Sequence, residues 1–130
     1  MTPRPRRRRA TAIVEYPEGI LVTVMRYMAC GLPGGSIQPG EAEEVVVVRE
    51  LREETGLIAD EAILLFHYET LVSDHAVFWV QARGTPAPRG KVDQLAYYRP
   101  GSALNLSPEA QAIIDRFYAY KAEHEQSRAR

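Results

Sequence analysis

Three glutamates, Glu50, Glu53 and Glu54, are spaced so that a helix would place their carboxylates on one face. Positions i, i+3 and i+4 are neighbours on a helix surface, and like charges there repel one another. A hard divalent cation such as Mg²⁺ or Mn²⁺ relieves that repulsion, because it binds carboxylate oxygens together with substrate phosphates. Arg49 and Arg52, which are interleaved with the glutamates, are expected to point elsewhere on the helix. The spacing therefore indicates a metal-binding helix face.

The same glutamates belong to a longer pattern, G-x5-E-x7-R-E-U-x-E-E-x-G-U with U aliphatic, which the segment Gly35–Leu57 matches at every specified position. The matching residues are Gly35, Glu41, Arg49, Glu50, Leu51, Glu53, Glu54, Gly56 and Leu57. This segment resembles the signature of the Nudix (MutT-related) hydrolases, and Leu32–Gly34 resembles its usual lead-in. So many fixed positions are far more specific than a lone glycine pattern.

The resemblance implies a fold and a reaction. The fold is α/β, a Nudix-type α/β/α sandwich with a mixed β-sheet and a loop–helix–loop catalytic motif. The reaction is hydrolysis of a diphosphate linkage in a nucleoside diphosphate joined to a group X. Mg²⁺ or Mn²⁺ is the expected cofactor, because a bound metal both neutralises phosphate oxygens and activates water.

Roles within the motif follow from the same resemblance. Glu53 and Glu54 are assigned as primary metal ligands, and Glu50 is either a third ligand or the general base. The backbone carbonyl of Gly34 is a further candidate ligand, because glycine allows the main chain to approach a metal closely. Arg49 is grouped with the catalytic residues, but its expected role is structural, because in the family it pairs with the glutamate at the Glu41 position and holds the loop against the helix. The residues with structural roles in the motif are Gly35, Glu41 and Gly56.

Three residues outside the motif are candidates for substrate binding: Arg9, Tyr27 and Asp93. Arg9 is at the start of the first expected strand, within a cluster of arginines that otherwise reads as a solvated basic end. Tyr27 could stack on a base or pack in the core. Asp93 lies where many Nudix proteins have an acidic loop residue that reaches the metal or acts as a base, although a solvated loop aspartate is the alternative.

Other side chains that could do chemistry are given structural interpretations. His67 and His75 are expected to be half-buried and hydrogen-bonded rather than catalytic. Trp79 is expected in the core, and Cys30, the only cysteine, as a small packing residue.

Composition bounds the class of protein. The chain has 130 residues and a net charge of −1, with 45% hydrophobic and 25% charged residues, as in ordinary globular domains. We expect a basic, disordered tail over residues 1–9, a single domain over 10–124 and a frayed end over 125–130. No apolar run is long enough for a signal peptide or a membrane span, so a cytoplasmic location and no membrane partner are expected.

The expected elements alternate between strands and helices. Residues 10–16 and 20–27 read as a hairpin around the turn at 17–19, and residues 42–55 as a helix ended by Gly56. Strands are expected near 58–71, 76–82 and 92–99, with a turn at 73–75 and a loop at 84–90. A serine cap and a proline at Ser107 and Pro108 start the last helix.

The substrate is less determined than the reaction class. The family's downstream markers for ADP-ribose, NADH and dinucleoside polyphosphate substrates are absent, and so is the upstream extension of its coenzyme A members. A (deoxy)nucleoside triphosphate, or an oxidised one, is therefore the expected substrate. The alternatives are a non-catalytic nucleotide sensor, or a pyrophosphohydrolase of inositol pyrophosphates or RNA 5′ ends that uses the basic N-terminus. The oligomeric state stays open, with a homodimer as one option.

Overall fold

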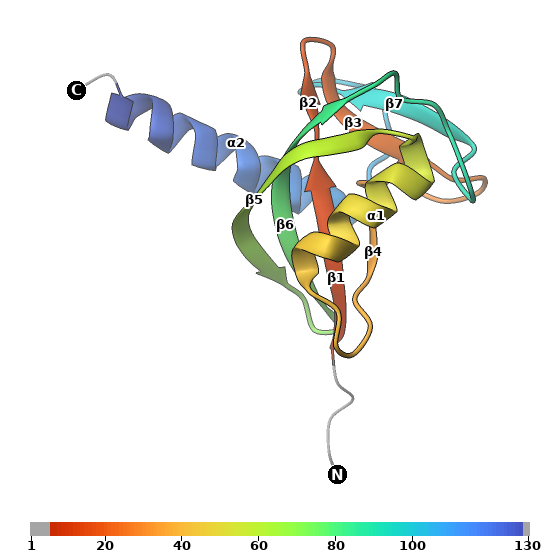
Figure 1. Cartoon of the computed structure of the whole chain (residues 1–130). Coiled ribbons are helices and arrows are strands. Elements are labelled where there is room, and N and C mark those ends of the chain that lie inside the picture. Colours follow the sequence, from red (N-terminus) through yellow and green to blue (C-terminus); the bar gives the residue numbers. More distant parts are fainter. Residues whose placement is uncertain (1–5, 129–130) are drawn as a thin grey trace.

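The computed structural model describes residues 6–128, which form two β-sheets and two α-helices (Figure 1). The elements are β1 (Arg7–Ile13), β2 (Glu15–Tyr16), β3 (Gly19–Val24), β4 (Gly34–Ser36), α1 (Glu43–Thr55), β5 (Ile58–Glu69), β6 (Ser73–Arg83), β7 (Gln94–Tyr98) and α2 (Pro108–Arg128). One sheet has the order β4-β1-β6-β5, with β1 parallel to β6 and the other pairs antiparallel. The second sheet, β2-β3-β7, is antiparallel. The predicted α/β class with a mixed sheet is confirmed.

Helices cover both faces of the four-stranded sheet, because the side chains of its central strands are apolar on both sides. Ala10 and Ala12 of β1 pack in the cluster that holds Val46, Val47 and Leu51 of α1. On the opposite face, Ile13 of β1 and Val77 of β6 pack with Ile113, Ile114 and Phe117 of α2 and with residues of the second sheet. The four-stranded sheet therefore separates two apolar cores.

Helix α1 forms in spite of four consecutive valines, which favour strands on propensity alone. Val46 and Val47 are fully buried, whereas Val45 and Val48 are exposed, so only two of the four valines offset the propensity cost. Gly56 ends the helix at φ 77°, and its N–H donates to the carbonyl of Arg52 at 2.9 Å. The helix predicted over residues 42–55 is confirmed to within one residue.

Helix α2 begins as predicted, with the Oγ of Ser107 accepting the N–H of Ala110 at 3.1 Å. It continues to Arg128, past the expected domain limit at residue 124, so part of the predicted frayed end is helical. No helix within residues 6–128 has both the length and the apolar character that crossing a membrane requires.

The first strand starts earlier than predicted. Strand β1 begins at Arg7, so Arg7, Arg8 and Arg9 lie in the sheet and not in the expected basic tail. Because β1 lies between β4 and β6, its backbone is paired on both sides: Arg9 is opposite Ser36 of β4 and His75 of β6. That pairing holds the arginines in a strand although their side chains are charged. Residues 1–5 of the expected tail lie outside the described residues.

Two further expectations were wrong. The expected pairing of residues 10–16 with 20–27 is limited to β2 and β3, because β1 pairs with β4 and β6 instead. The turn expected at 73–75 lies at Thr70–Val72, and Ser73–His75 belongs to β6. The Oγ1 of Thr70 accepts the N–H groups of Val72 and Ser73, which closes this turn although its tip is apolar.

Candidate active site

The glycine pair at the start of the motif brings backbone into close contact with its neighbours. Gly34 and Gly35 lie in β4, against β1 on one side and α1 on the other. A Cβ atom on Gly34 would collide with the carbonyl of Ala10, and one on Gly35 would collide with the side chain of Glu50. The Gly34 N–H donates to Oε1 of Glu54 at 2.8 Å. These contacts fix the loop to the acidic end of the helix.

Substituting Gly34 should therefore destabilise the fold. Gly34→Ala is expected to lower the free energy of unfolding by about 1–3 kcal/mol, because the backbone of β1 cannot yield as a side chain would. Urea unfolding monitored by circular dichroism measures the difference. Gly31→Ala is the matched control, because a Cβ there meets only Thr23 at an ordinary 3.7 Å. Equal stabilities of the two variants would contradict the close-packing role of Gly34.

The three motif carboxylates occupy different environments at the end of α1. Glu53 is largely exposed, with a side-chain exposure of 59%, whereas that of Glu50 is 22%. Glu54 is half-buried and lines a pocket. Burial raises its pKa to about 7, and the nearby charges of Glu50 and Glu53 add to the rise, while the Gly34 N–H and Arg9 oppose it. The like-charge crowding predicted from the spacing is therefore present.

Arg49 lies against the acidic face and does not point away from it as the sequence suggested. Its guanidinium is 2.5 Å from Glu41, 3.6 Å from Glu50 and 3.8 Å from Glu53. The hydrogen bond from Arg49 lowers the pKa of Glu41, and Glu41 raises that of Arg49. Because Glu41 also accepts the N–H of Gln38 at 2.9 Å, this pair connects the loop to the helix, as the motif implied.

The donor set fits a hard divalent cation. Within residues 6–128 no three Asp, Glu, His or Cys side chains are gathered into a ready binding cluster. Glu50 and Glu53 lie within 4 Å of Arg49, while Glu54 is hydrogen-bonded to Gly34. The oxygens are nevertheless of the kind that Mg²⁺ and Mn²⁺ prefer, and burial, with a smaller contribution from the charges of Glu50 and Glu53, raises the pKa of Glu54. A cation among them would relieve the cost of ionising Glu54.

A pocket of about 510 Å³ begins at Glu54 and extends between β1, β6 and the start of α2. Arg7, Arg9 and Thr11 of β1 line it, because alternate residues of a strand face the same side. Ser73 and His75 of the neighbouring strand line it as well. The apolar part of the lining includes Met25, Met28, Leu32, Val72 and Ile113. Such a mixture of apolar walls and a few polar groups is typical of small-molecule sites.

The structure brings only one of the three predicted substrate-binding residues to this pocket. Arg9 lines it beside Glu54. Tyr27 is 98% exposed at a positive φ of 64° and is not part of the lining. Asp93 is also outside the lining, and its carboxylate accepts the N–H of Arg26 at 2.5 Å. Asp93 therefore caps a loop here, and neither Tyr27 nor Asp93 contacts the motif glutamates.

Sequence reasoning missed Arg7, Thr11 and Ser73, and treated His75 as structural. His75 is hydrogen-bonded as expected, but it is buried rather than half-buried, and it forms part of the pocket wall. Burial lowers its pKa, and the positive charge of Arg9 lowers it further. The sequence signal that could have identified Arg7 and Thr11 is their alternation with Arg9. In a strand that begins at Arg7, these three residues share one face.

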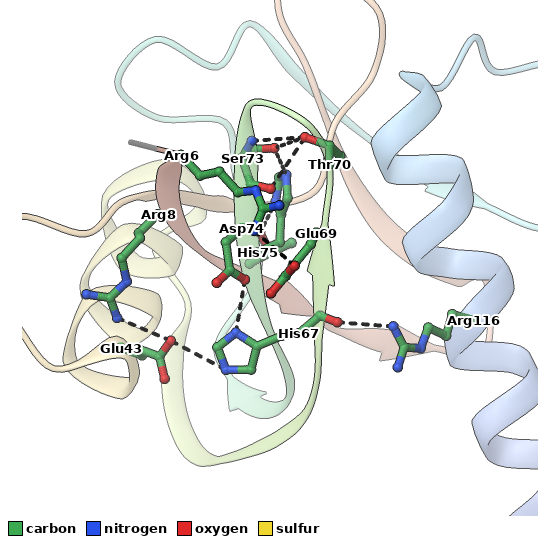
Figure 2. Close-up of polar contacts among 11 residues, drawn as sticks. Arg6, Arg8, Glu43, His67, Glu69, Thr70, Ser73, Asp74, His75 and Arg116 are labelled. Atoms are coloured by element: carbon green, nitrogen blue, oxygen red, sulfur yellow. Dashed lines mark hydrogen bonds and ion pairs between the residues drawn. The ribbon is translucent and has the colours of Figure 1, made fainter. Parts of the chain in front are cut away.

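The other arginines of the basic segment point away from the pocket. Arg6 pairs with Glu69 at 3.0 Å, and Arg8 lies 3.6 Å from Glu43 of α1 (Figure 2). His67 also contacts Glu43, at 3.7 Å, and Asp74, at 3.0 Å, on this outer side. The described arginines therefore divide between two faces of β1 and do not form one basic stripe.

The two remaining structural expectations hold. Trp79 packs edge-on against Phe117 with ring centroids 5.1 Å apart. Cys30 is buried in the core beneath α2.

Comparisons with known proteins agree with this geometry. A family model described as the NUDIX domain matches residues 5–120. The crystal structure of a nudix family member from Chromobacterium violaceum is 36% identical and superposes with a TM-score of 0.86, covering 98% of this chain and 90% of that one. A MutT NUDIX hydrolase from Burkholderia pseudomallei, 20% identical, shares the fold with a TM-score of 0.75 over 86% of this chain and 98% of its own.

A curated relative gives a more specific but shorter match. The 8-oxo-dGTP diphosphatase of Escherichia coli (strain K12) is 36% identical over 77 residues, which cover 57% of this chain. The match spans 56% of that relative's length.

Proposed function

The chain belongs to the NUDIX domain family, and from this premise we propose that it is a metal-dependent pyrophosphohydrolase. It hydrolyses a diphosphate linkage in a nucleoside diphosphate joined to a group X. The observation that carries the proposal is the complete acidic face, with Glu54 at the end of the pocket and its pKa raised to about 7. A sensor that had lost catalysis would have no need to keep three carboxylates in this crowded arrangement.

Nudix hydrolases generally use divalent metal ions, and Mg²⁺ or Mn²⁺ is the cofactor we propose here. Glu50, Glu53 and Glu54 would hold it, with the Gly34 carbonyl as a further ligand. The bound ion supplies charge neutralisation at the phosphates and lowers the pKa of water.

The side chains around the pocket have roles of their own. Arg9 and Arg7, two residues apart on the same face of β1, offer guanidinium groups to phosphate oxygens beside Glu54. Arg49 holds Glu41 and lies within 4 Å of Glu50 and Glu53, so it positions the acidic face rather than contacting substrate. One of the three carboxylates must also accept the proton of the attacking water. Glu50 and Glu54 are the candidates, because both are less exposed than Glu53.

The proposed substrate is a (deoxy)nucleoside triphosphate or an oxidised form of one. The curated relative named for 8-oxo-dGTP supports this class, and a pocket of about 510 Å³ has the size of small-molecule sites. The apolar lining from Met25, Met28 and Leu32 suits the flat face of a base.

The experiment that tests the function is a hydrolysis assay over a panel of nucleotides. The panel contains the common (deoxy)nucleoside triphosphates, 8-oxo-dGTP, ADP-ribose, a 5′-triphosphorylated RNA and an inositol pyrophosphate. We expect release of pyrophosphate or phosphate from triphosphates with Mg²⁺ or Mn²⁺, and a fall to background with excess EDTA. Turnover restricted to the RNA or the inositol pyrophosphate would reject the substrate class. Nucleotide binding without turnover of any compound would instead indicate a sensor.

A further inference from the structure

The last turn of α1 contains Glu53 and Glu54, two of the three proposed metal ligands. The last four carbonyl groups of an α-helix have no partner within the helix. In α1 the Gly56 N–H binds the carbonyl of Arg52, which leaves the carbonyls of Glu53, Glu54 and Thr55. A helix end without such partners frays, and the two carboxylates would move with it.

The loop between β6 and β7, residues 84–93, supplies partners to this helix end. It lies beside the C-terminal end of α1 (Figure 1). The N–H of Arg89 donates to the carbonyl of Glu54 at 3.0 Å, and the N–H of Ala87 donates to the carbonyl of Thr55 at 2.9 Å. Thr55 is completely buried, so water does not readily replace the donor that the loop provides there.

The sequence of the loop suits this role. Pro88 lies between the two donors and has no N–H of its own, and Pro86 precedes them. Each proline fixes its own φ and restricts the residue before it to extended conformations, so few alternative shapes compete with the observed one. Gly90, at φ 60°, then brings the loop backbone next to the carbonyl of Glu53.

The far end of the loop is attached to the second sheet. Val92 is buried, and the N–H of Asp93 donates to the carbonyl of Val24 in β3 at 2.9 Å. The Asp93 carboxylate accepts the N–H of Arg26. The loop therefore connects the second sheet to the end of α1, and hydrogen bonds to the main chain attach it at both places.

We propose that the backbone N–H groups of Ala87 and Arg89 position the metal-binding end of α1. Arg89 is then a positioning residue for Glu54 that acts through its main chain, since its side chain is exposed and lies over Gly56. Glu54 is bound at two points, because its carbonyl accepts the Arg89 N–H and its carboxylate accepts the Gly34 N–H. Ligands placed in this way need no further ordering when a cation binds.

This inference rests on the proposed function, because it assumes that Glu53 and Glu54 bind the cation. The test compares two substitutions at one position of the full-length chain. Arg89→Ala removes the guanidinium and keeps the N–H, whereas Arg89→Pro removes both. The dissociation constant of Mn²⁺ is measured by electron paramagnetic resonance without substrate. We expect Arg89→Pro to bind Mn²⁺ about tenfold more weakly than Arg89→Ala.

A second readout is steady-state hydrolysis of the best nucleotide of the panel. The Mg²⁺ concentration that gives half-maximal kcat should rise for Arg89→Pro relative to Arg89→Ala. The KM for the nucleotide at saturating Mg²⁺ should differ less than twofold between them. Thermal unfolding in EDTA measures the effect on stability separately, so a purely structural role of the loop would lower the Tm and leave the Mn²⁺ affinities equal.

Thr85→Pro is the matched control, because it places a proline in the same loop where the N–H makes no hydrogen bond within residues 6–128. Its Mn²⁺ affinity should equal that of the wild type. If Arg89→Pro does not fold, Ala87→Pro is compared with the wild type, and the same weakening is expected. Equal Mn²⁺ affinities in the pair that folds would overturn this inference and leave the proposed function standing. A wild type that neither binds Mn²⁺ nor hydrolyses any nucleotide would overturn the proposed function and this inference with it.

Discussion

Glu53→Gln is expected to lower kcat by about 10²–10⁴-fold, because it would remove one of the proposed, negatively charged metal ligands and with it several kcal/mol of transition-state stabilisation. The fold should not change. The Glu53 side chain is 59% exposed, and among residues 6–128 it forms an ion pair with Arg49 alone, at 3.8 Å. Such surface contacts contribute little to stability. The measurement is kcat at saturating Mg²⁺ for the best substrate of the panel, with thermal unfolding as the check on folding.

Glu44→Gln is the control for this experiment, since Glu44 is an exposed acidic residue in the first turn of the same helix. The same charge is lost from α1, but far from the pocket, so kcat should change less than twofold. If Glu53→Gln kept more than a tenth of the wild-type kcat, the assignment of Glu53 as a metal ligand would be wrong.

The parts of the fold that the sequence predicted correctly are those determined by local chemistry. Helix α1 was predicted from its place in the motif, against the strand propensity of its four valines, and from Gly56, whose left-handed conformation ends it. The start of α2 follows from Ser107 and Pro108 in the same way. Each signal lies within one or two turns of the helix that it determines, so no knowledge of the tertiary structure is needed.

The expectations that were wrong depend on contacts between residues far apart in the chain. The strand character of Arg7–Arg9 comes from pairing with Ser73–His75, more than sixty positions away in the numbering. Local composition gives no signal of that partner, so the arginines resembled a solvated tail. The turn at Thr70–Val72 was missed for a related reason: Leu71 and Val72 are apolar but 95% and 72% exposed.

As with the fold, the parts of the site that depend on local sequence were predictable, and the parts that depend on distant segments were not. The motif glutamates are adjacent on one helix, and their crowding is visible in the spacing alone. The pocket is not, because β1, β6 and α2 contribute to it from three distant segments. Arg9 was found through its position at the first strand, whereas Thr11 and Ser73 have no local signal. Asp93 was chosen for its place before a strand, yet its carboxylate is engaged by the Arg26 amide.

The crowding that serves catalysis also has a cost in the metal-free protein. Burial and the neighbouring carboxylates raise the pKa of Glu54 from 4.5 to about 7. The folded state therefore binds a proton more tightly than the unfolded state, and stability falls as the pH rises from about 4.5 to 7. The pKa difference corresponds to a loss of at most about 3 kcal/mol in the free energy of unfolding. Because Glu54 is only partly buried, screening by solvent reduces this loss to about 1–2 kcal/mol.

Glu54→Gln should therefore abolish activity and stabilise the metal-free protein at the same time. A glutamine stays neutral at every pH and can still accept the Gly34 N–H, so it avoids the cost of burying a charge. At pH 8 in EDTA we expect a gain of about 1–2 kcal/mol in the free energy of unfolding, shrinking toward zero near pH 4. Urea unfolding of both proteins across this range measures the difference.

Mg²⁺ is expected to act on the two stabilities in the opposite direction. A cation that binds only the folded state stabilises it by mass action, so Mg²⁺ should raise the wild-type unfolding free energy more than that of the variant. A variant that is less stable than the wild type at pH 8 without metal would show that the ionised Glu54 is not destabilising. A gain that persists at pH 4 would show that the effect comes from packing rather than charge. Because titration of the carboxyl predicts both the sign and the pH range, the two measurements together separate the electrostatic cost of the acidic face from its role as a metal site.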